Sequence, residues 1–170
     1  LDPELIIIGE EILTSRGELL AFFVKEEVPR GLEPLEAIKR LRDQNAFISV
    51  SHPFDRLRHG WELEDLIEIT PLVDAIEIFN ARSFISNVNE EAKEYARVNH
   101  LRGTIGSDAH TLVEVGRATQ LIPPFTDSES MKQSFLEPEY LTKSSSPMIR
   151  FSSTSAKIAK KIFGKDKFSI

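Results

Sequence analysis

Short apolar runs alternate along this chain with longer amphipathic segments, and together they predict its secondary structure. Runs that are continuous or alternate with polar residues predict strands over residues 5–8, 19–24, 46–51, 74–80, 103–107 and 118–123. Segments with helix-start signals or one apolar face predict helices over residues 33–45, 62–70, 89–100 and 126–136. A turn at TSRGE, residues 14–18, predicts that the first two strands form a hairpin-like unit.

Local signals fix the ends of the first helix, residues 33–45. Pro34 is placed in its first turn, where a missing backbone N–H costs nothing. Leu35, Ile38 and Leu41 are expected on one face, and Asn45 is a plausible stop.

The order of these segments indicates the fold class. Strand, loop and helix recur at roughly regular spacing, without a long series of hairpins. This order is typical of parallel βαβ units in an α/β protein, here as an arc of a barrel. We expect one domain over residues 1–141, then a linker and a basic C-terminal helix over 142–170 that packs on the same domain. From Arg150 onward that segment holds six Lys or Arg residues and one Asp.

The composition excludes several kinds of site and partner but does not restrict the fold class further. The chain has 170 residues, a net charge of −6 and no cysteine. It therefore has no disulfide, thiolate nucleophile or cysteine-bound zinc, and its overall charge does not attract nucleic acid or an anionic membrane. No run of membrane-spanning length and no signal peptide is present, so we expect a cytoplasmic location without a membrane partner. No protein partner is evident.

Several polar residues follow the predicted strands directly. They are Glu10, Glu11, His52, Asn80, Asp108 and His110. In parallel α/β folds the carboxyl ends of the strands converge on one edge, where ligands and catalytic groups collect. Imidazole and carboxylate ligands together suit Zn²⁺, Mn²⁺ or Fe²⁺ better than Ca²⁺. Each short motif alone is common in loops, but their combination predicts a metal site.

The segment TIGSDAHT carries the most specific pair. In an extended segment, residues two apart point the same way, so Asp108 and His110 are expected to reach one ion or two neighbouring ions. Ala109 then points away, and its small side chain avoids crowding.

Four motifs resemble the PHP family, the polymerase and histidinol phosphatase phosphoesterases. They are GEE, SHPFDR, EIFNAR and GSDAHT with EVGRA, spread over about residues 5–125. The resemblance implies a distorted (β/α)₇ barrel, similar to a TIM barrel. It also implies two or three divalent metal ions (Mn, Zn or Fe, with Mg as a further option) at the carboxyl ends of the strands, and hydrolysis of phosphoesters.

The same resemblance implies roles for single residues. Glu11, His52, Asp108 and His110 match metal ligands, and Glu10 is the non-ligand residue of the Gly-x-Glu pattern. Asp108 and His110 are the expected catalytic pair, as ligands that also influence proton transfer. Asn80 matches a position beside the site.

The chain departs from the family pattern at its beginning. The family's first motif is a His-x-His pair, but the histidines here are residues 52, 59, 100 and 110 only. The chain also opens at LDPELIII without methionine. We therefore expect an incomplete barrel that lacks its first strands, and a chain that alone is under-coordinated for two metals and inactive.

Recognition of a phosphate group requires local cations in so acidic a chain. FDRLRH beside His52 supplies arginines, of which Arg56 is the first candidate, and Arg82 follows the next strand. The expected substrate is a phosphorylated small molecule, a nucleotide or an oligonucleotide. The alternative is a PHP-like scaffold or binding module without catalysis.

Overall fold

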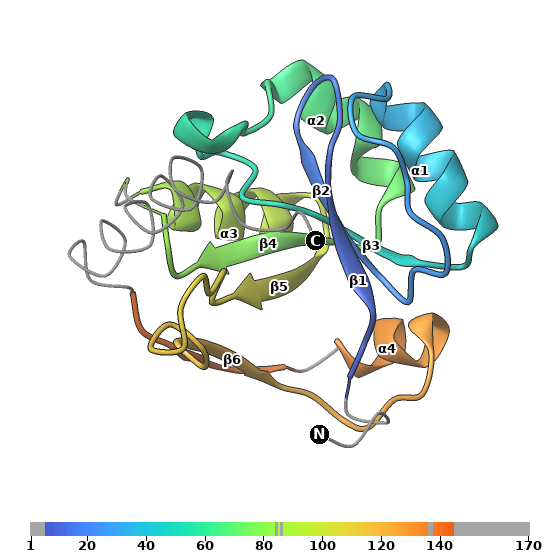
Figure 1. Cartoon of the computed structure of the whole chain (residues 1–170). Helices are drawn as coiled ribbons and strands as arrows, with labels where there is room; N and C mark the ends of the chain where they lie inside the picture. Colours follow the sequence, from blue (N-terminus) through green and yellow to red (C-terminus); the bar gives the residue numbers. More distant parts are fainter. Residues whose placement is uncertain (1–5, 84, 86, 136–137, 145–170) are drawn as a thin grey trace, which may run out of the picture.

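The computed structural model describes residues 6–83, 85, 87–135 and 138–144, which form two sheets and four α-helices (Figure 1). The larger sheet has the order β1-β2-β3-β4-β5, and β6 pairs with β7. The strands are β1 (Gly9–Leu13), β2 (Glu18–Phe22), β3 (Phe47–Val50), β4 (Ala75–Asn80), β5 (Arg102–Gly106), β6 (Ala118–Leu121) and β7 (Glu139–Thr142). The helices are α1 (Pro34–Asp43), α2 (Leu63–Ile69), α3 (Val88–Val98) and α4 (Ser128–Ser134), with short 3₁₀ turns η2 (Arg56–Arg58) and η3 (Thr70–Leu72).

The larger sheet is mixed. β1 and β2 form an antiparallel hairpin, β2 is antiparallel to β3, and β3, β4 and β5 run parallel. The predicted hairpin and the predicted parallel βαβ units are therefore both confirmed. The described strands form an open sheet and do not close into a barrel.

The first strand lies later in the chain than predicted. Residues 5–8 were expected to form a buried strand, but β1 begins at Gly9, and Ile6 and Ile8 are 53% and 70% exposed. The partner strand explains the difference. β2 ends at Phe22, and Phe23 adopts a left-handed backbone with φ of 64°, so the strand pairing does not continue to the described residues before Gly9. Glu10 and Glu11 consequently lie within a strand and not in the loop after one.

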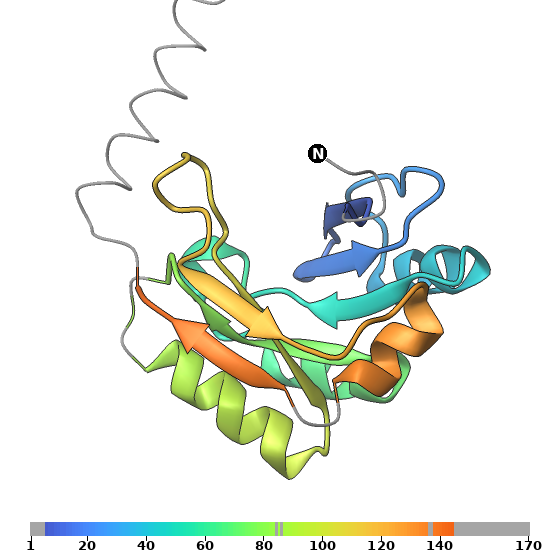
Figure 2. The same cartoon turned by 90° about the horizontal axis from the view of Figure 1, so that it is seen from below.

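Helices cover one face of the sheet and build the main core. Figure 2 shows α3 on this side, while the hairpin and the loop between β5 and β6 rise from the opposite side. In α1 the buried residues are Pro34, Ala37, Ile38 and Leu41, whereas Leu35 is 46% exposed. At 3.6 residues per turn, Leu35 falls at the border of that buried face, so the expectation that it shares one face with Ile38 and Leu41 was wrong.

The opposite face of the sheet has an apolar and a polar part. α4 covers the apolar part by packing Met131 and Phe135 against Phe47 and Ala75. Further toward the carboxyl ends of the parallel strands, buried Ser49 and Thr104 share a hydrogen bond of 2.8 Å between their hydroxyl oxygens. This polar part leads directly to the residues of the candidate site.

The C-terminal portion contains an element that the sequence did not predict. Residues 139–142 form β7, paired with β6, although the linker was expected to begin at residue 142. The predicted basic helix lies outside the described residues and stays a prediction. Of the helices that are described, none combines the length and the apolar character that a bilayer crossing requires.

Trp61 fastens the hairpin turn to the core, and its removal should destabilise the fold. It is 2% exposed, and its indole Nε1 donates to the Glu18 carbonyl oxygen at 3.1 Å. We expect Trp61→Ala to lower the free energy of unfolding by about 3–5 kcal/mol in urea denaturation, because it opens a large cavity. The control Leu57→Ala removes a side chain that is 75% exposed and should change it by less than about 0.5 kcal/mol. A loss below about 1 kcal/mol for Trp61→Ala would contradict this assignment.

Candidate metal centre

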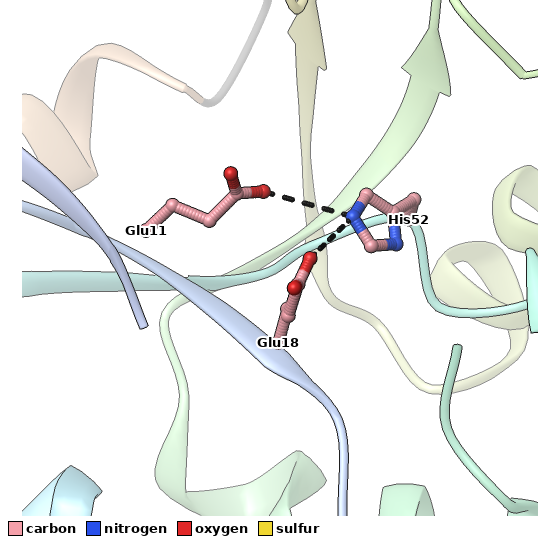
Figure 3. A group of neighbouring side chains, drawn as sticks. All are labelled: Glu11, Glu18 and His52. Carbon is pink, nitrogen blue, oxygen red and sulfur yellow. Dashed lines mark ion pairs between the residues drawn. The ribbon is translucent and has the colours of Figure 1, made fainter. Parts of the chain in front are cut away.

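Three side chains from β1, β2 and the end of β3 converge on one point (Figure 3). The Nε2 atom of His52 lies 2.8 Å from Glu18 Oε2 and 3.6 Å from Glu11 Oε1. One ligand atom from each of the three residues lies within 4.8 Å of the other two. This spacing allows all three to bind a single ion.

Strand register explains why the two glutamates share a face. Glu11 is paired with Leu20 across the hairpin, so their side chains lie on the same side of the sheet. Glu18 is two residues from Leu20 and therefore also points to that side. Glu10 points to the other side, where its carboxylate accepts a hydrogen bond from the Val28 N–H at 3.1 Å. Its expected role as the non-ligand of the pair agrees with this orientation.

Glu18 is the ligand candidate that sequence reasoning missed. It was assigned to the turn between the first two strands, but it is the first residue of β2. The signal was present, because a hairpin that places Glu11 opposite Leu20 also places Glu18 on the same face. It could be read only with the correct register.

His52 is held in an unusual position. It is 4% exposed, its backbone has φ of 23°, and its Nε2 faces the carboxylates of Glu18 and Glu11, while Nδ1 has no hydrogen-bond partner in the described part of the chain. A buried imidazole nitrogen that faces two carboxylates is a donor set that a divalent cation can bind. A positive φ in a residue other than glycine costs free energy and concentrates at functional sites.

Charge in the cluster favours a bound cation. Although burial lowers the pKa of His52, the facing carboxylates of Glu11 and Glu18 raise it overall, to about 9. The hydrogen bond and charge of His52 in turn lower the pKa of Glu11. In the metal-free protein, a proton on the His52 imidazole neutralises part of the negative charge of the Glu11 and Glu18 carboxylates. A divalent ion bound to neutral His52 would neutralise that charge in place of the proton. Two carboxylates and one imidazole suit Mn²⁺, Fe²⁺ or Zn²⁺.

Glu77 holds the backbone of His52 in place through a hydrogen bond. It lies on β4, is 3% exposed, and accepts the His52 backbone N–H at 2.9 Å. Burial raises the pKa of Glu77, and two hydrogen bonds from the Asn80 side-chain amide at 3.2 and 3.1 Å favour its ionised form. Gly106 on β5 makes room for it, because a Cβ there would lie 2.5 Å from Glu77 Oε1. Glu77 thereby links β3, β4 and β5 below the site.

Asp108 enters the same region from the end of β5. It is a second residue with a left-handed backbone, φ 47°, and its carboxylate forms an ion pair with Arg58. The charge of Arg58 lowers the pKa of both Glu11 and His52, and the charge of Asp108 raises that of Glu77. The Asn80 side-chain amide donates to Glu77 and to Asp108 Oδ2, so Asp108 is linked to the residue that holds the His52 backbone.

His110 contacts Asp108, although the left-handed backbone of Asp108 departs from the extended segment that was expected there. Its Nδ1 is 2.9 Å from the Asp108 carbonyl oxygen and 3.4 Å from Oδ1 of the same residue. Neither Asp108 nor His110 joins the three-residue group around His52 within the described residues. The structure therefore contains a three-residue group around His52 and, separately, the pair of Asp108 and His110. The assignment of all four predicted ligands to metal stays a prediction.

A buried glutamate fixes the loop that carries His110. Glu114 has no exposed surface, and its carboxylate accepts the His110 backbone N–H at 3.0 Å and the Thr111 hydroxyl at 2.9 Å. It also forms an ion pair with Arg82 at 3.1 Å. Although burial raises it, these hydrogen bonds and the Arg82 charge lower the pKa of Glu114 overall. Sequence reasoning quoted EVGRA as a motif but gave Glu114 no role.

The predicted substrate-binding residues occupy different environments. Arg56 is largely exposed and pairs with Glu62 at 3.1 Å. Arg82 is nearly buried against Glu114, and Asn80 bonds to Glu77 and Arg58. Arg58, which was not chosen from the sequence, is the arginine that contacts Asp108. None of these placements tests a role in substrate binding.

Removal of Glu77 should weaken metal binding although it is not a ligand. Glu77→Ala leaves the His52 backbone N–H without its acceptor and frees the strained residue, so we expect metal affinity to fall about 10–100-fold. Isothermal titration with Mn²⁺ measures the change. The matched control is Asp74→Asn, since Asp74 also accepts a β3 backbone N–H, from Ile48 at 2.8 Å, at the other end of that strand. Equal losses in the two variants would show that only general stability is affected.

Comparisons with known proteins bear on the family and the fold of the chain. Residues 87–137 match the family model described as PHP-associated. Uncharacterized protein MJ0417 of Methanocaldococcus jannaschii is 39% identical over 116 residues, which are 66% of this chain and 49% of that protein. Uncharacterized protein MJ1587 of the same organism is 36% identical over 76 residues, 45% of this chain and 43% of that protein. The chain thus spans about half the length of the curated relatives it matches.

Two crystal structures share the fold. PsfC from Pseudomonas syringae matches with a TM-score of 0.63 at 20% identity, over 89% of this chain and 65% of that one. A two-domain protein from Bacteroides vulgatus, described as containing a predicted PHP-like metal-dependent phosphoesterase, matches with a TM-score of 0.62 at 17% identity, over 81% and 45% of the two chains. At these identities the likeness concerns the fold.

Proposed function

We propose that this chain belongs to the PHP family and is the metal-binding part of a phosphoesterase that hydrolyses a phosphomonoester or phosphodiester. The observation that carries the proposal is the convergence of Glu11, Glu18 and His52, with the buried His52 Nε2 facing both carboxylates.

We assign the ligands as two neighbouring groups. Glu11, Glu18 and His52 would hold one divalent ion, and Asp108 with His110 would hold or share a second. Mn, Zn or Fe suits these ligands, and Mg remains an option for the carboxylates. When bound, the ions would supply a water of lowered pKa and positive charge for the phosphoryl oxygens.

The chain's own residues prepare this chemistry. Glu77 fixes the His52 backbone, and Glu114 fixes the loop of His110. His52 would have to be neutral to hold a metal, so binding would release the proton that its imidazole carries in the metal-free protein. Asp108 and His110 are the expected catalytic pair, and their side chains are 16% and 31% exposed, so a substrate phosphate would approach from the side of His110. Substrate roles for Asn80, Arg56 and Arg82 stay predictions.

The open sheet is compatible with an arc of the family's barrel, and we propose that the family's (β/α)₇ barrel is its complete form. Further strands would bind at the β1 edge and could bring additional ligands to the same face.

Hydrolysis of bis-p-nitrophenyl phosphate and p-nitrophenyl phosphate with Mn²⁺ tests the function. The proposed function predicts release of p-nitrophenol that depends on metal and is lost in Asp108→Asn. The control is Asp43→Asn, an exposed carboxylate on α1 that pairs with Lys39. Metal binding without hydrolysis of either substrate would favour the scaffold alternative for this chain.

A further inference from the structure

Arg58 lies where the two halves of the site meet. One of its terminal nitrogens donates to Asn80 Oδ1 at 3.1 Å, and the other forms an ion pair with Asp108 Oδ2. Its side chain is 23% exposed, so the guanidinium is held at the border between the site and solvent.

This contact sets a cation against a carboxylate that is expected to bind metal. Oδ2 of Asp108 accepts from Arg58 and, at 3.4 Å, from the Asn80 amide, while Oδ1 faces His110 Nδ1. A divalent ion on Asp108 would meet both the occupied Oδ2 and the positive charge of Arg58. The guanidinium and the ion therefore compete for the same carboxylate.

We propose that Arg58 exchanges partners: it pairs with Asp108 in the metal-free protein, and when metal takes Asp108 it binds a phosphoryl oxygen of the substrate. This inference rests on the proposed function, because it needs a metal at Asp108 and a phosphorylated ligand. It adds a residue and an order of events that the motifs did not indicate.

The geometry favours Arg58 over the other arginines near the site. Its bond to Asn80 Oδ1 keeps the guanidinium in place after the Asp108 contact breaks, so one edge stays free for an anion. A planar guanidinium can bind two phosphate oxygens at once. Arg82 is engaged by the buried Glu114, and Arg56 pairs with Glu62 outside this network.

Two measurements on the full 170-residue chain should change in opposite directions. In Arg58→Ala, the dissociation constant for Mn²⁺ should fall about tenfold, because a competing positive charge is gone. In the Mn²⁺-loaded chain, the dissociation constant for inorganic phosphate should rise about tenfold or more, because the anion loses its arginine. Isothermal titration calorimetry measures both constants.

A double-mutant cycle identifies the partner. In an Asp108→Asn background, Arg58→Ala should no longer tighten Mn²⁺ binding, because the carboxylate under competition is absent. Arg58→Lys keeps the charge but not the planar fork, so it should leave Mn²⁺ affinity near the wild-type value and still weaken phosphate binding.

The matched control is Arg42→Ala. Arg42 also pairs with a nearly buried aspartate, Asp74, at 2.6 Å, but at the opposite end of β3. This variant should change neither constant. Circular dichroism checks that each variant is folded, and Arg58→Lys provides the test if Arg58→Ala is not.

The outcomes separate this inference from the proposed function. Unchanged or weaker Mn²⁺ binding in Arg58→Ala, or unchanged phosphate binding, overturns the exchange even if the protein is a phosphoesterase. Opposite shifts without hydrolysis of any phosphoester support the exchange and count against catalysis by this chain. A wild-type chain that binds no Mn²⁺ overturns the exchange as well.

Discussion

Saturating Mn²⁺ should stabilise the wild-type chain markedly, and His52→Ala should abolish that stabilisation. A ligand that binds only the folded state at a hundred times its dissociation constant adds about 2.7 kcal/mol. For a domain of this size, that corresponds to a rise of about 5–10 °C in the unfolding midpoint. His52 is the residue that both glutamates face, so its loss should reduce the rise to less than about 1 °C. Thermal unfolding followed by circular dichroism, with and without Mn²⁺, measures it.

The comparison is made within each variant, because His52→Ala also changes the metal-free protein. His100→Asn is the matched histidine control. His100 is exposed and has a left-handed backbone with φ of 54°, which asparagine tolerates. This variant should keep the full Mn²⁺ effect. A His52→Ala chain that Mn²⁺ stabilises as much as wild type would place the metal elsewhere.

Metal affinity should rise steeply with pH, which is the second large effect. The pKa of His52 is raised to about 9 in the metal-free protein, so at neutral pH an entering ion must displace a proton. Affinity for Mn²⁺ should therefore increase about tenfold per pH unit, or about a hundredfold between pH 6 and pH 8, and level off above about 9. Calorimetry in buffers of different ionisation enthalpy should detect release of about one proton per ion.

The stability of the metal-free chain should change in the other direction. A histidine whose pKa is raised from 6.5 to about 9 on folding stabilises the fold fully below pH 6.5, and this contribution is lost as the pH rises through about 9. Rising pH thus weakens the metal-free fold and strengthens metal binding. A Mn²⁺ affinity that does not vary with pH would show that His52 is not a ligand.

Strand ends and motifs were readable from the sequence because they depend on local patterns. His52, Asn80 and Asp108 lie where the apolar runs of β3, β4 and β5 end, as predicted. Parallel order among these strands also followed from the alternation of strands with helices. Each of these predictions needs only a short segment of the sequence and the spacing of its apolar and polar residues.

Residues that depend on register were not readable in the same way. Glu18 joins the site because of the pairing between β1 and β2, and the start of β1 was placed too early. Glu77 sits in a strand with alternating apolar residues, which predicts an outward polar side chain. It is buried because Gly106 on the neighbouring strand leaves space and because His52 and Asn80 supply hydrogen bonds. Such positions are decided by contacts between distant segments.

The sequence also could not decide which of two arginines lies at the site, because this too depends on contacts between distant segments. Arg56 and Arg58 are two residues apart in FDRLRH, and composition alone does not distinguish them. The 3₁₀ turn η2 directs Arg56 toward Glu62 and Arg58 toward Asp108. A difference of two positions in a tight turn thus decides which arginine meets the site.

The most direct test of the metal centre is the metal content of the chain itself. The wild-type chain, the double variant Glu11→Gln with His52→Ala, and the control His100→Asn would be equilibrated with Mn²⁺ or Zn²⁺, freed of unbound metal and analysed by elemental mass spectrometry. We predict at least one ion per chain in wild type and control, and at least one ion fewer in the double variant. Equal metal in all three, or none in wild type, would contradict the assignment of Glu11, Glu18 and His52 as a metal centre.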